Sequence, residues 1–194
     1  MSKIAQNKEK KKQAILAAAK SVFLSEGYSS ASMDGIAVQA KITKQTLYRY
    51  FPSKIELFQA TLQQIGENYN DRYSQHLALE STRDALIAFA SEFMKFHLSQ
   101  EHIAVQRLLI AEAVQEPEIV QRFMRMGPDD TNRSLNVFFV ERFKLRQPHT
   151  KIELWIGMLL APRSEALLGM SVLNEQQIEQ HAIEATDVLL LGIQ

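Results

Sequence analysis

The sequence predicts an all-α protein of about nine to ten helices, and three observations support this fold class. Only seven glycines and five prolines interrupt the 194 residues. Runs of β-branched residues are almost absent, and apolar residues recur over long stretches with the 3.6-residue period of an amphipathic helix. The apolar fraction of 46% is ordinary for a globular protein and sufficient for a sizeable core.

The composition also excludes several classes of protein. The chain has no cysteine, which excludes disulfides and thiolate chemistry. No window of about 18 uncharged apolar residues is present, so we expect no membrane span and no membrane partner. The polar N-terminus lacks the apolar core of a secretory signal, and we expect a cytoplasmic protein.

The net charge of zero hides an asymmetry. Residues 1–54 contain ten Lys and Arg against three acidic residues, which gives +7, whereas residues 55–194 contain twelve against nineteen, which gives −7. A basic quarter joined to an acidic remainder is typical of a nucleic-acid module attached to another kind of domain. We therefore expect one domain at 1–54 and a second at 55–194, with the fourth helix bridging the two.

The first helix is expected at about 9–26, after a frayed start. Gly27 suits the position after it, where φ turns positive. The apolar stripe of this helix consists of Ile15, Ala18, Ala19, Val22 and Phe23. The preceding basic run is either a solvated helix start or an arm near DNA phosphates. That run consists of Lys8, Lys10, Lys11 and Lys12.

Residues 32–54, SMDGIAVQAKITKQTLYRYFPSK, predict two short helices joined by a tight turn and then the start of a long helix. Ser32 and Thr43 are the expected N-caps of the short helices, and Pro52 ends the second one. A capping box of Ser53 and Glu56 opens the long helix, which extends to about residue 76.

The two short helices have separate apolar and polar faces. The residues expected to face inward are Ile36, Ala37 and Ala40 on the first and Leu47 and Phe51 on the second. The outward residues of the second helix are Lys44, Gln45, Thr46, Tyr48, Arg49 and Tyr50. A short helix that presents cations, an amide, hydroxyls and phenols is suited to a DNA groove.

Further helices are expected at about 82–98, 102–114, 117–126, 128–145, 149–172 and 175–191. Ser81 and Asp84 cap the first of them, and Gly127 with Pro128 closes one helix and opens the next. Pro162 is expected to kink or break the helix at 149–172, because it lacks an N–H group and crowds the carbonyl four residues back.

The motif T-L-Y-R-Y-F-P-S-K at residues 46–54 resembles the signature of the TetR family of regulators. Gly27-Tyr28 and Ile36-Ala37 fit the same pattern, and the stretch R-L-L-I-A-E-A at 107–113 resembles the family's C-terminal domain more loosely. The resemblance implies a homodimeric repressor with one helix-turn-helix per subunit at 1–54 and a palindromic DNA operator. It also implies a ligand-binding and dimerisation domain at 55–194, whose ligand releases the DNA.

The match to the motif implies roles for individual residues. Phosphate contacts are expected from Thr43, Tyr48, Tyr50 and Lys54, and the residues nearest the base edges are Lys44, Gln45 and Thr46. A lysine can donate to guanine, and a glutamine can bridge two atoms of adenine. Packing on the first and fourth helices is the alternative for the two tyrosines, and pairing with a local acid is the alternative for Arg49. Lys41 and Gln45 depart from the family pattern, which often has glycine at both positions.

In the second domain, the resemblance implies a pocket for a small apolar or amphipathic ligand. Its expected residues are Phe89, Phe93, Phe96, His97, Trp155 and Met158, although such an apolar stripe is also typical of a plain core. His102 lies about 140° around a helix from His97, so we expect no metal pair, and no cofactor is expected. For Arg163 three roles are possible: it is exposed, it bonds to the carbonyls that the break at Pro162 frees, or it binds a ligand carboxylate.

The last two helices are expected to form the homodimer interface as a four-helix arrangement. Control by a protein partner instead of a small molecule remains an alternative. An enzyme is not expected, because the chain has no cysteine, no G-x-S-x-G motif and no Glu-x-x-His pair for a di-metal centre.

Overall fold

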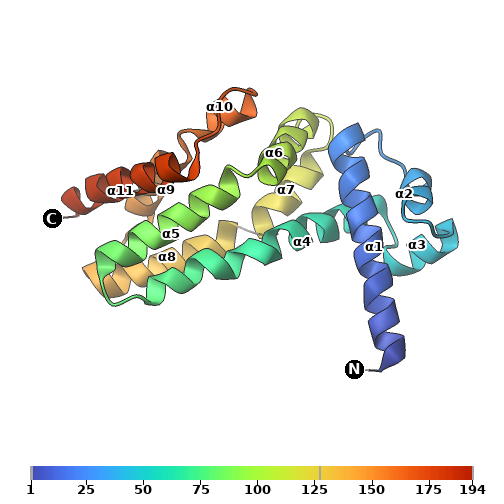
Figure 1. The fold of residues 1–194 in the computed structure, drawn as a ribbon, viewed down its shortest axis with the longest axis horizontal. Helices are drawn as coiled ribbons and strands as arrows, with labels where there is room; N and C mark the ends of the chain where they lie inside the picture. Colours follow the sequence, from blue (N-terminus) through green and yellow to red (C-terminus); the bar gives the residue numbers. More distant parts are fainter. Residues whose placement is uncertain (1, 127, 194) are drawn as a thin grey trace. The chain divides into compact units, whose positions relative to one another are not determined.

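The structure is a computed structural model, and it describes residues 2–126 and 128–193. Side chains are described for these residues except 4, 67–72, 125, 126 and 128–130. Within this range the chain forms eleven α-helices and one 3₁₀-helix and no strand, which confirms the all-α prediction (Figure 1). No helix among the described residues is long and apolar enough to cross a membrane.

The helices follow the chain in a simple order. In the N-terminal part they are α1 (Lys3–Glu26), α2 (Met33–Gln39), α3 (Lys44–Tyr50) and α4 (Lys54–Ser74), followed by the 3₁₀-helix η1 (Gln75–Ala78). The middle part contains α5 (Thr82–His97), α6 (Gln100–Glu112), α7 (Pro117–Met126) and α8 (Pro128–Phe143). The last three are α9 (His149–Leu160), α10 (Arg163–Leu167) and α11 (Glu175–Leu191).

The expected frayed start of the chain is wrong, because α1 already begins at Lys3. The Ser2 side chain accepts a hydrogen bond from the N–H of Ala5 (3.3 Å) and caps the helix. Alanine, lysine, glutamine and glutamate then continue it, and all of these residues favour helix. The basic run therefore lies on a regular, exposed helix rather than on an irregular arm.

Pro162 breaks the helix expected at 149–172 into α9 and α10, which explains why the described residues form one helix more than the expected nine to ten. α9 ends at Leu160, and the N–H of Ala161 bonds to the carbonyl of Met158 (3.3 Å) in a tightened last turn. α10 begins directly after the proline and has only five residues. The other expected stop, at Gly127, lies outside the described residues.

Backbone contacts divide the chain into two compact units. The first contains residues 2–66 and 107–125, and the second contains residues 67–106, 126 and 128–193. Both α4 and α6 therefore contribute to both units. The domain boundary after Lys54 stays a prediction.

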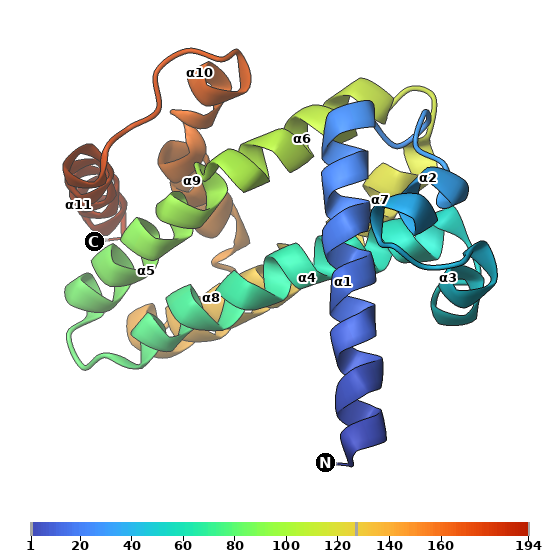
Figure 2. The same ribbon diagram turned by 45° about the vertical axis from the view of Figure 1, so that its right-hand side comes forward.

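The core of the first unit joins α1 to the start of α4 (Figure 2). The five apolar residues predicted for the stripe of α1 are all buried. Phe23 of α1 meets Phe58 of α4 at 5.0 Å between ring centroids, and Tyr28 stands 5.0 Å from Phe58. These three rings fix the loop between α1 and α2 on the long helix.

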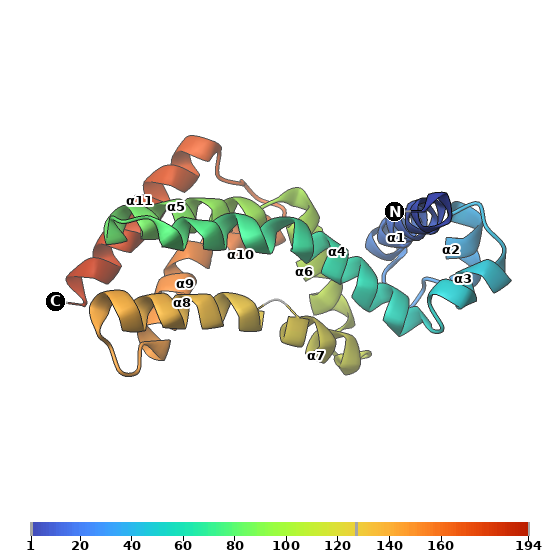
Figure 3. The ribbon, with the colours of Figure 1, turned by 90° about the horizontal axis from the view of Figure 1, so that it is seen from below.

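The core of the second unit is built on α5, which lies alongside α11 (Figures 1 and 3). Phe89 of α5, Trp155 of α9 and Phe139 of α8 are fully buried at its centre. Across the α5–α11 contact, Arg83 forms a two-pronged ion pair with Asp187 (2.8 and 3.0 Å). His181 of α11 bonds to the carbonyl of Met158 (2.8 Å), which joins α11 to α9.

Candidate nucleic-acid interface

The α2–turn–α3 segment begins each helix at the predicted cap. The side chain of Ser32 accepts from the N–H of Gly35 (3.0 Å), and that of Thr43 accepts from the N–H of Thr46 (3.2 Å). α3 ends before Pro52, with Phe51 already extended at φ −137°. Local sequence chemistry therefore determines both ends of α3.

The turn between the two helices is a Schellman motif with lysine in the left-handed position. Lys41 has a φ of +56°, at a site where the family often has glycine. The N–H of Lys41 bonds to Val38 O (3.0 Å), and the N–H of Ile42 reaches back to Ala37 O (3.0 Å). A non-glycine residue in this conformation costs about 1 kcal/mol, which these two bonds offset.

The predicted inward face of the segment is confirmed for four of its five residues. Ile36, Ala37, Leu47 and Phe51 are buried, and Ala40 is half-buried. The opposite face of α3 is open to solvent. Its exposed side chains are Lys44, Gln45, Tyr48 and Arg49, with Thr46 and Tyr50 half-buried beside them.

The structure bears on the alternative roles considered for Tyr48, packing on α1 and α4, and for Arg49, pairing with a local acid. Tyr48 is 41% exposed, so its ring is not enclosed by packing on α1 and α4. Arg49 is exposed, and no carboxylate among the described side chains pairs with it. Lys44 does have a partner, because its Nζ lies 2.8 Å from Asp34 of α2. That ion pair is exposed to solvent, so Lys44 can exchange Asp34 for another anion.

Lys54 lies in the first turn of α4, and its ammonium group is directed at the protein. Its Nζ donates to the carbonyls of Tyr28 (2.9 Å), Ser29 (3.2 Å) and Ala31 (3.1 Å), and it lies 4.5 Å from the centroid of the Tyr28 ring. In this arrangement Lys54 holds the α1–α2 loop in place. Its expected phosphate contact stays a prediction.

Glu112 of α6 is a residue of this unit that the sequence reasoning missed. Its carboxylate is buried and accepts from the N–H of Ser29 (3.0 Å) and from the hydroxyl of Ser29. Burial alone would raise the pKa of Glu112, but these bonds, a bond from the N–H of Tyr28 and the charge of Lys54 hold it below its ordinary value. Glu112 and Lys54 thus hold the same loop from two sides.

The sequence contained only a weak signal for this contact. Glu112 lies inside the R-L-L-I-A-E-A stretch, where a carboxylate among apolar residues suggests a buried partner. Gly27 is the second element of the contact. Its φ of +84° fits the predicted positive value, and a Cβ at this position would lie 2.9 Å from Glu112 Oε1.

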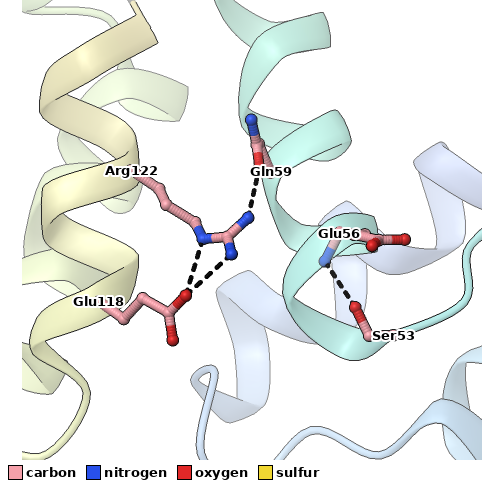
Figure 4. A network of polar contacts seen from close by, with 5 residues as sticks. All are labelled: Ser53, Glu56, Gln59, Glu118 and Arg122. Carbon is pink, nitrogen blue, oxygen red and sulfur yellow. Dashed lines mark hydrogen bonds and ion pairs between the residues drawn. The ribbon is translucent and has the colours of Figure 1, made fainter.

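α7 supports the first turns of α4 from another side (Figure 4). Arg122 donates to Glu118 within α7 (2.8 Å) and to Gln59 of α4 (2.9 Å). At the N-terminus of α4, the N–H of Glu56 bonds to Ser53 Oγ (3.3 Å), which is the first half of the predicted capping box. The helix after the helix-turn-helix is therefore capped by Ser53 and held by α7.

In the second unit, the structure gathers the residues predicted for a ligand pocket into one cluster. Phe89, Phe93, Phe96 and Trp155 are buried in its core, and Met158 packs against it. His97 is half-buried at the end of α5, 4.1 Å from the ring of Phe93. Whether these side chains touch a ligand stays a prediction.

The expectation that His97 and His102 point apart is wrong. It assumed one continuous helix, but α5 ends at His97 and α6 begins at Gln100, so the chain turns between the two rings. His97 Nδ1 lies 3.0 Å from His102 Nε2, which makes the two residues a hydrogen-bonded pair. No group of three or more metal-ligating side chains occurs among the residues whose side chains are described.

Two family models match this chain. Residues 15–61 match the model of bacterial regulatory proteins of the tetR family. Residues 84–147 match the C-terminal domain of AefR-like transcriptional repressors. The first match contains the helix-turn-helix, and the second contains most of α5 to α8.

Solved structures share the fold over nearly the whole chain. A TetR-family transcriptional regulator from Mesorhizobium loti superposes with a TM-score of 0.82 at 24% identity, over 99% of this chain and 98% of that one. The flavonoid-responsive regulator FrrA superposes with a TM-score of 0.77 at 28% identity, over 95% of this chain and 97% of that one.

Among curated relatives, the transcriptional activator FasR of Mycolicibacterium smegmatis is 34% identical over 114 residues. That match includes 58% of this chain, and the chain spans about half (51%) of FasR. The relatives named here are transcriptional regulators and not enzymes. On the two model matches, the shared fold and these relatives, the chain belongs to the TetR family of transcriptional regulators.

Proposed function

We propose that this chain is a DNA-binding transcriptional regulator that acts as a homodimer on a palindromic operator and releases it when a small ligand binds. The observation that carries the proposal is the open face of α3. This helix buries Leu47 and presents an amide, phenols and cations to solvent. A helix of this kind, capped at its N-terminus after a tight turn, fits the major groove of DNA.

The placement of side chains on α3 supports a division of roles. Lys44, Gln45 and Thr46 form its first turn, which approaches the base edges in helix-turn-helix proteins. Tyr48, Arg49 and Tyr50 follow on the last turn, with Thr43 before the helix, and we assign these to phosphates together with Lys54. Lys44 must exchange Asp34 for a DNA atom, and Lys54 must share its ammonium group between the α1–α2 loop and a phosphate.

A homodimer through α9 and α11 is supported by apolar side chains that both helices leave exposed. Leu154 of α9 is 65% exposed, and Val188 and Leu191 of α11 are 56% and 71% exposed. Two copies of such a surface can cover each other in a self-complementary interface. The dimer would place two α3 helices on two half-sites of an inverted repeat.

Ligand control is supported by the aromatic cluster of the second unit. The structurally similar FrrA is a flavonoid-responsive regulator, and this property of FrrA supports a small-molecule signal for a protein with this fold. Ligand binding would favour a conformation that no longer fits the operator, by no more than the ligand's difference in affinity for the two states. Relatives act in both directions, because FasR is named an activator and the matched C-terminal model a repressor.

A second candidate, control by a protein partner, is favoured by the close packing of the same cluster. Phe89, Phe139 and Trp155 have no exposed surface, so a ligand must displace side chains to reach them. Under this candidate, small molecules leave DNA binding unchanged and a bound protein alters it.

Fluorescence anisotropy with labelled DNA from upstream of the protein's own gene tests the proposal. We expect the wild-type protein to bind an inverted repeat with an affinity that falls as salt rises. Gln45→Ala should lose the discrimination between bases at one base pair of each half-site, a loss of about 1–3 kcal/mol in binding free energy. Arg49→Gln should weaken binding to all sequences alike, and Arg146→Gln, in the exposed loop before α9, is the matched control. Absence of sequence-selective binding at any inverted repeat there would contradict the proposal.

A further inference from the structure

Arg163 is a half-buried cation without a counter-charge. It opens α10 directly after Pro162, and none of the described residues accepts a hydrogen bond from its guanidinium or forms an ion pair with it. Burial lowers the pKa of Arg163, although a guanidinium stays charged at neutral pH. A partly desolvated charge without a partner is unfavourable, so this position favours an anion.

The histidine pair is close enough to Arg163 for the charge of the guanidinium to act on both rings, and the pair is itself uncharged. Burial, then His102 and then Arg163 keep the pKa of His97 well below its usual range, and burial with Arg163 lowers that of His102 to about 4. Both rings are therefore neutral at pH 7. His102 Nε2 lies 3.0 Å from His97 Nδ1 and 3.2 Å from the amide nitrogen of Gln106. The other ring nitrogen of His97, Nε2, has no described partner.

A continuous row of rings extends from the histidine pair into the core. The ring of Phe93 lies 4.1 Å from His97, that of Phe89 follows at 5.6 Å, and that of Trp155 at 5.7 Å. At the far end, Trp155 Nε1 is buried and has no hydrogen-bond partner among the described atoms. The row of rings therefore offers an apolar surface that begins at His97.

We propose that the controlling ligand is a small amphipathic carboxylate, whose carboxylate binds the Arg163 guanidinium and whose apolar body lies along the rings of His97, Phe93 and Phe96. The planar fork of one arginine matches a carboxylate. A single positive charge near neutral imidazoles favours a monoanion over a phosphate dianion. The inference rests on the proposed ligand control and narrows it to one class of molecule.

Calorimetry on the full-length protein without DNA tests this class directly. The probes are matched acids and primary amides, namely octanoate with octanamide, decanoate with decanamide, and 3-phenylpropanoate with 3-phenylpropanamide. The straight-chain pairs and the aromatic pair distinguish the two kinds of apolar body. We expect at least one acid to bind about tenfold or more tightly than its amide.

Variants then assign the charge preference to Arg163. Arg163→Gln should bring the acid-to-amide affinity ratio close to one while leaving the amide affinity unchanged, and Arg163→Lys should retain part of the preference. Arg146→Gln removes an exposed arginine of the same unit and should leave the ratio unchanged. Thermal unfolding checks that each variant is folded.

Equal binding of every acid and its amide by the wild-type protein would overturn the inference without need of any variant. An acid preference that persists in Arg163→Gln would also overturn it. DNA release is measured separately with the labelled operator. Carboxylate binding at Arg163 that leaves the operator bound would retain the anion site and contradict ligand control, whereas DNA release by amides and acids alike would retain ligand control and contradict the anion site.

Discussion

Gly27 and Glu112 form the most constrained residue contact of the helix-turn-helix unit. Gly27 has φ +84° and ψ 169°, a conformation that is accessible essentially only to glycine. The missing side chain also lets the Glu112 carboxylate approach the backbone of the α1–α2 loop, where it binds Ser29. One backbone position therefore serves both the end of α1 and the attachment of α6.

Gly27→Ala should destabilise the protein by about 2 kcal/mol, because it adds backbone strain and brings the new Cβ against Glu112. Urea denaturation measures this loss. Gly66→Ala is the matched control, since its Cβ meets nothing within 4 Å in α4 and should stabilise by about 0.5–1 kcal/mol. Equal stability of the Gly27 variant and the wild type would show that the loop adapts.

Glu112 makes stability depend on pH in a direction that its environment determines. Because its pKa in the folded state lies below the ordinary 4.5, its contribution is fully present above about pH 4.5 and is lost as the pH falls through the lower folded value. Glu112→Gln should cost about 1–3 kcal/mol at pH 7, with a difference from wild type that shrinks below pH 4.5. A difference that stays constant between pH 7 and pH 3 would exclude an ionised Glu112 as its source.

Among the helices, α1 differs most from expectation. Its first three turns are helical and largely exposed, so the lysines at 8, 10, 11 and 12 lie on a regular helix. On a helix of 3.6 residues per turn, Lys8, Lys11 and Lys12 share one side, while Lys10 faces another. A positively charged side of this kind is suited to the phosphate backbone.

Replacing Lys8, Lys11 and Lys12 together with Gln should weaken operator binding and reduce the slope of log K against log salt by about 0.9 for each phosphate that the variant no longer neutralises. Anisotropy titrations between 50 and 200 mM salt, roughly the range over which such ion pairs respond, measure the slope. Lys144→Gln, at the end of α8 in the second unit, should leave it unchanged. An unchanged slope in the triple variant would identify the run as a solvated face.

For the molecule as a whole, the proposed operator contact requires two copies of the chain. The exposed apolar residues of α9 and α11 are the surface that we assign to the contact between the two copies. A charge placed there would have to be buried without a partner in the dimer, which is strongly unfavourable.

Val188→Arg combined with Leu191→Arg should therefore convert the dimer to a folded monomer and abolish tight binding to the inverted repeat. Sedimentation velocity measures the mass, and circular dichroism checks that the helices remain. Val114→Glu, at an apolar residue that is 91% exposed in the first unit, should leave the mass unchanged. A dimer that persists in the double variant would place the interface on another surface.

The features that depend on neighbouring residues could be predicted from the sequence. The caps at Ser32, Thr43 and Ser81, the stop at Pro52 and the break at Pro162 each follow from hydrogen bonding or sterics within a few residues of chain. The buried stripe of α1 follows from its 3.6-residue periodicity. Periodicity and capping can be recognised within short stretches of sequence, and the all-α fold class could be predicted from them.

Which distant groups meet depends on the tertiary structure and could not be predicted. The binding of Ser29 by Glu112 joins residues 83 positions apart, and the three carbonyls bound by Lys54 belong to a loop more than 20 residues earlier. The meeting of His97 and His102 was missed because a single helical rotation was applied across the predicted break between the helices at 82–98 and 102–114, and only the path of the chain through that break decides how the two rings meet. Local propensity determines where helices begin and end, whereas packing determines which buried charges find partners and which, like Arg163, do not.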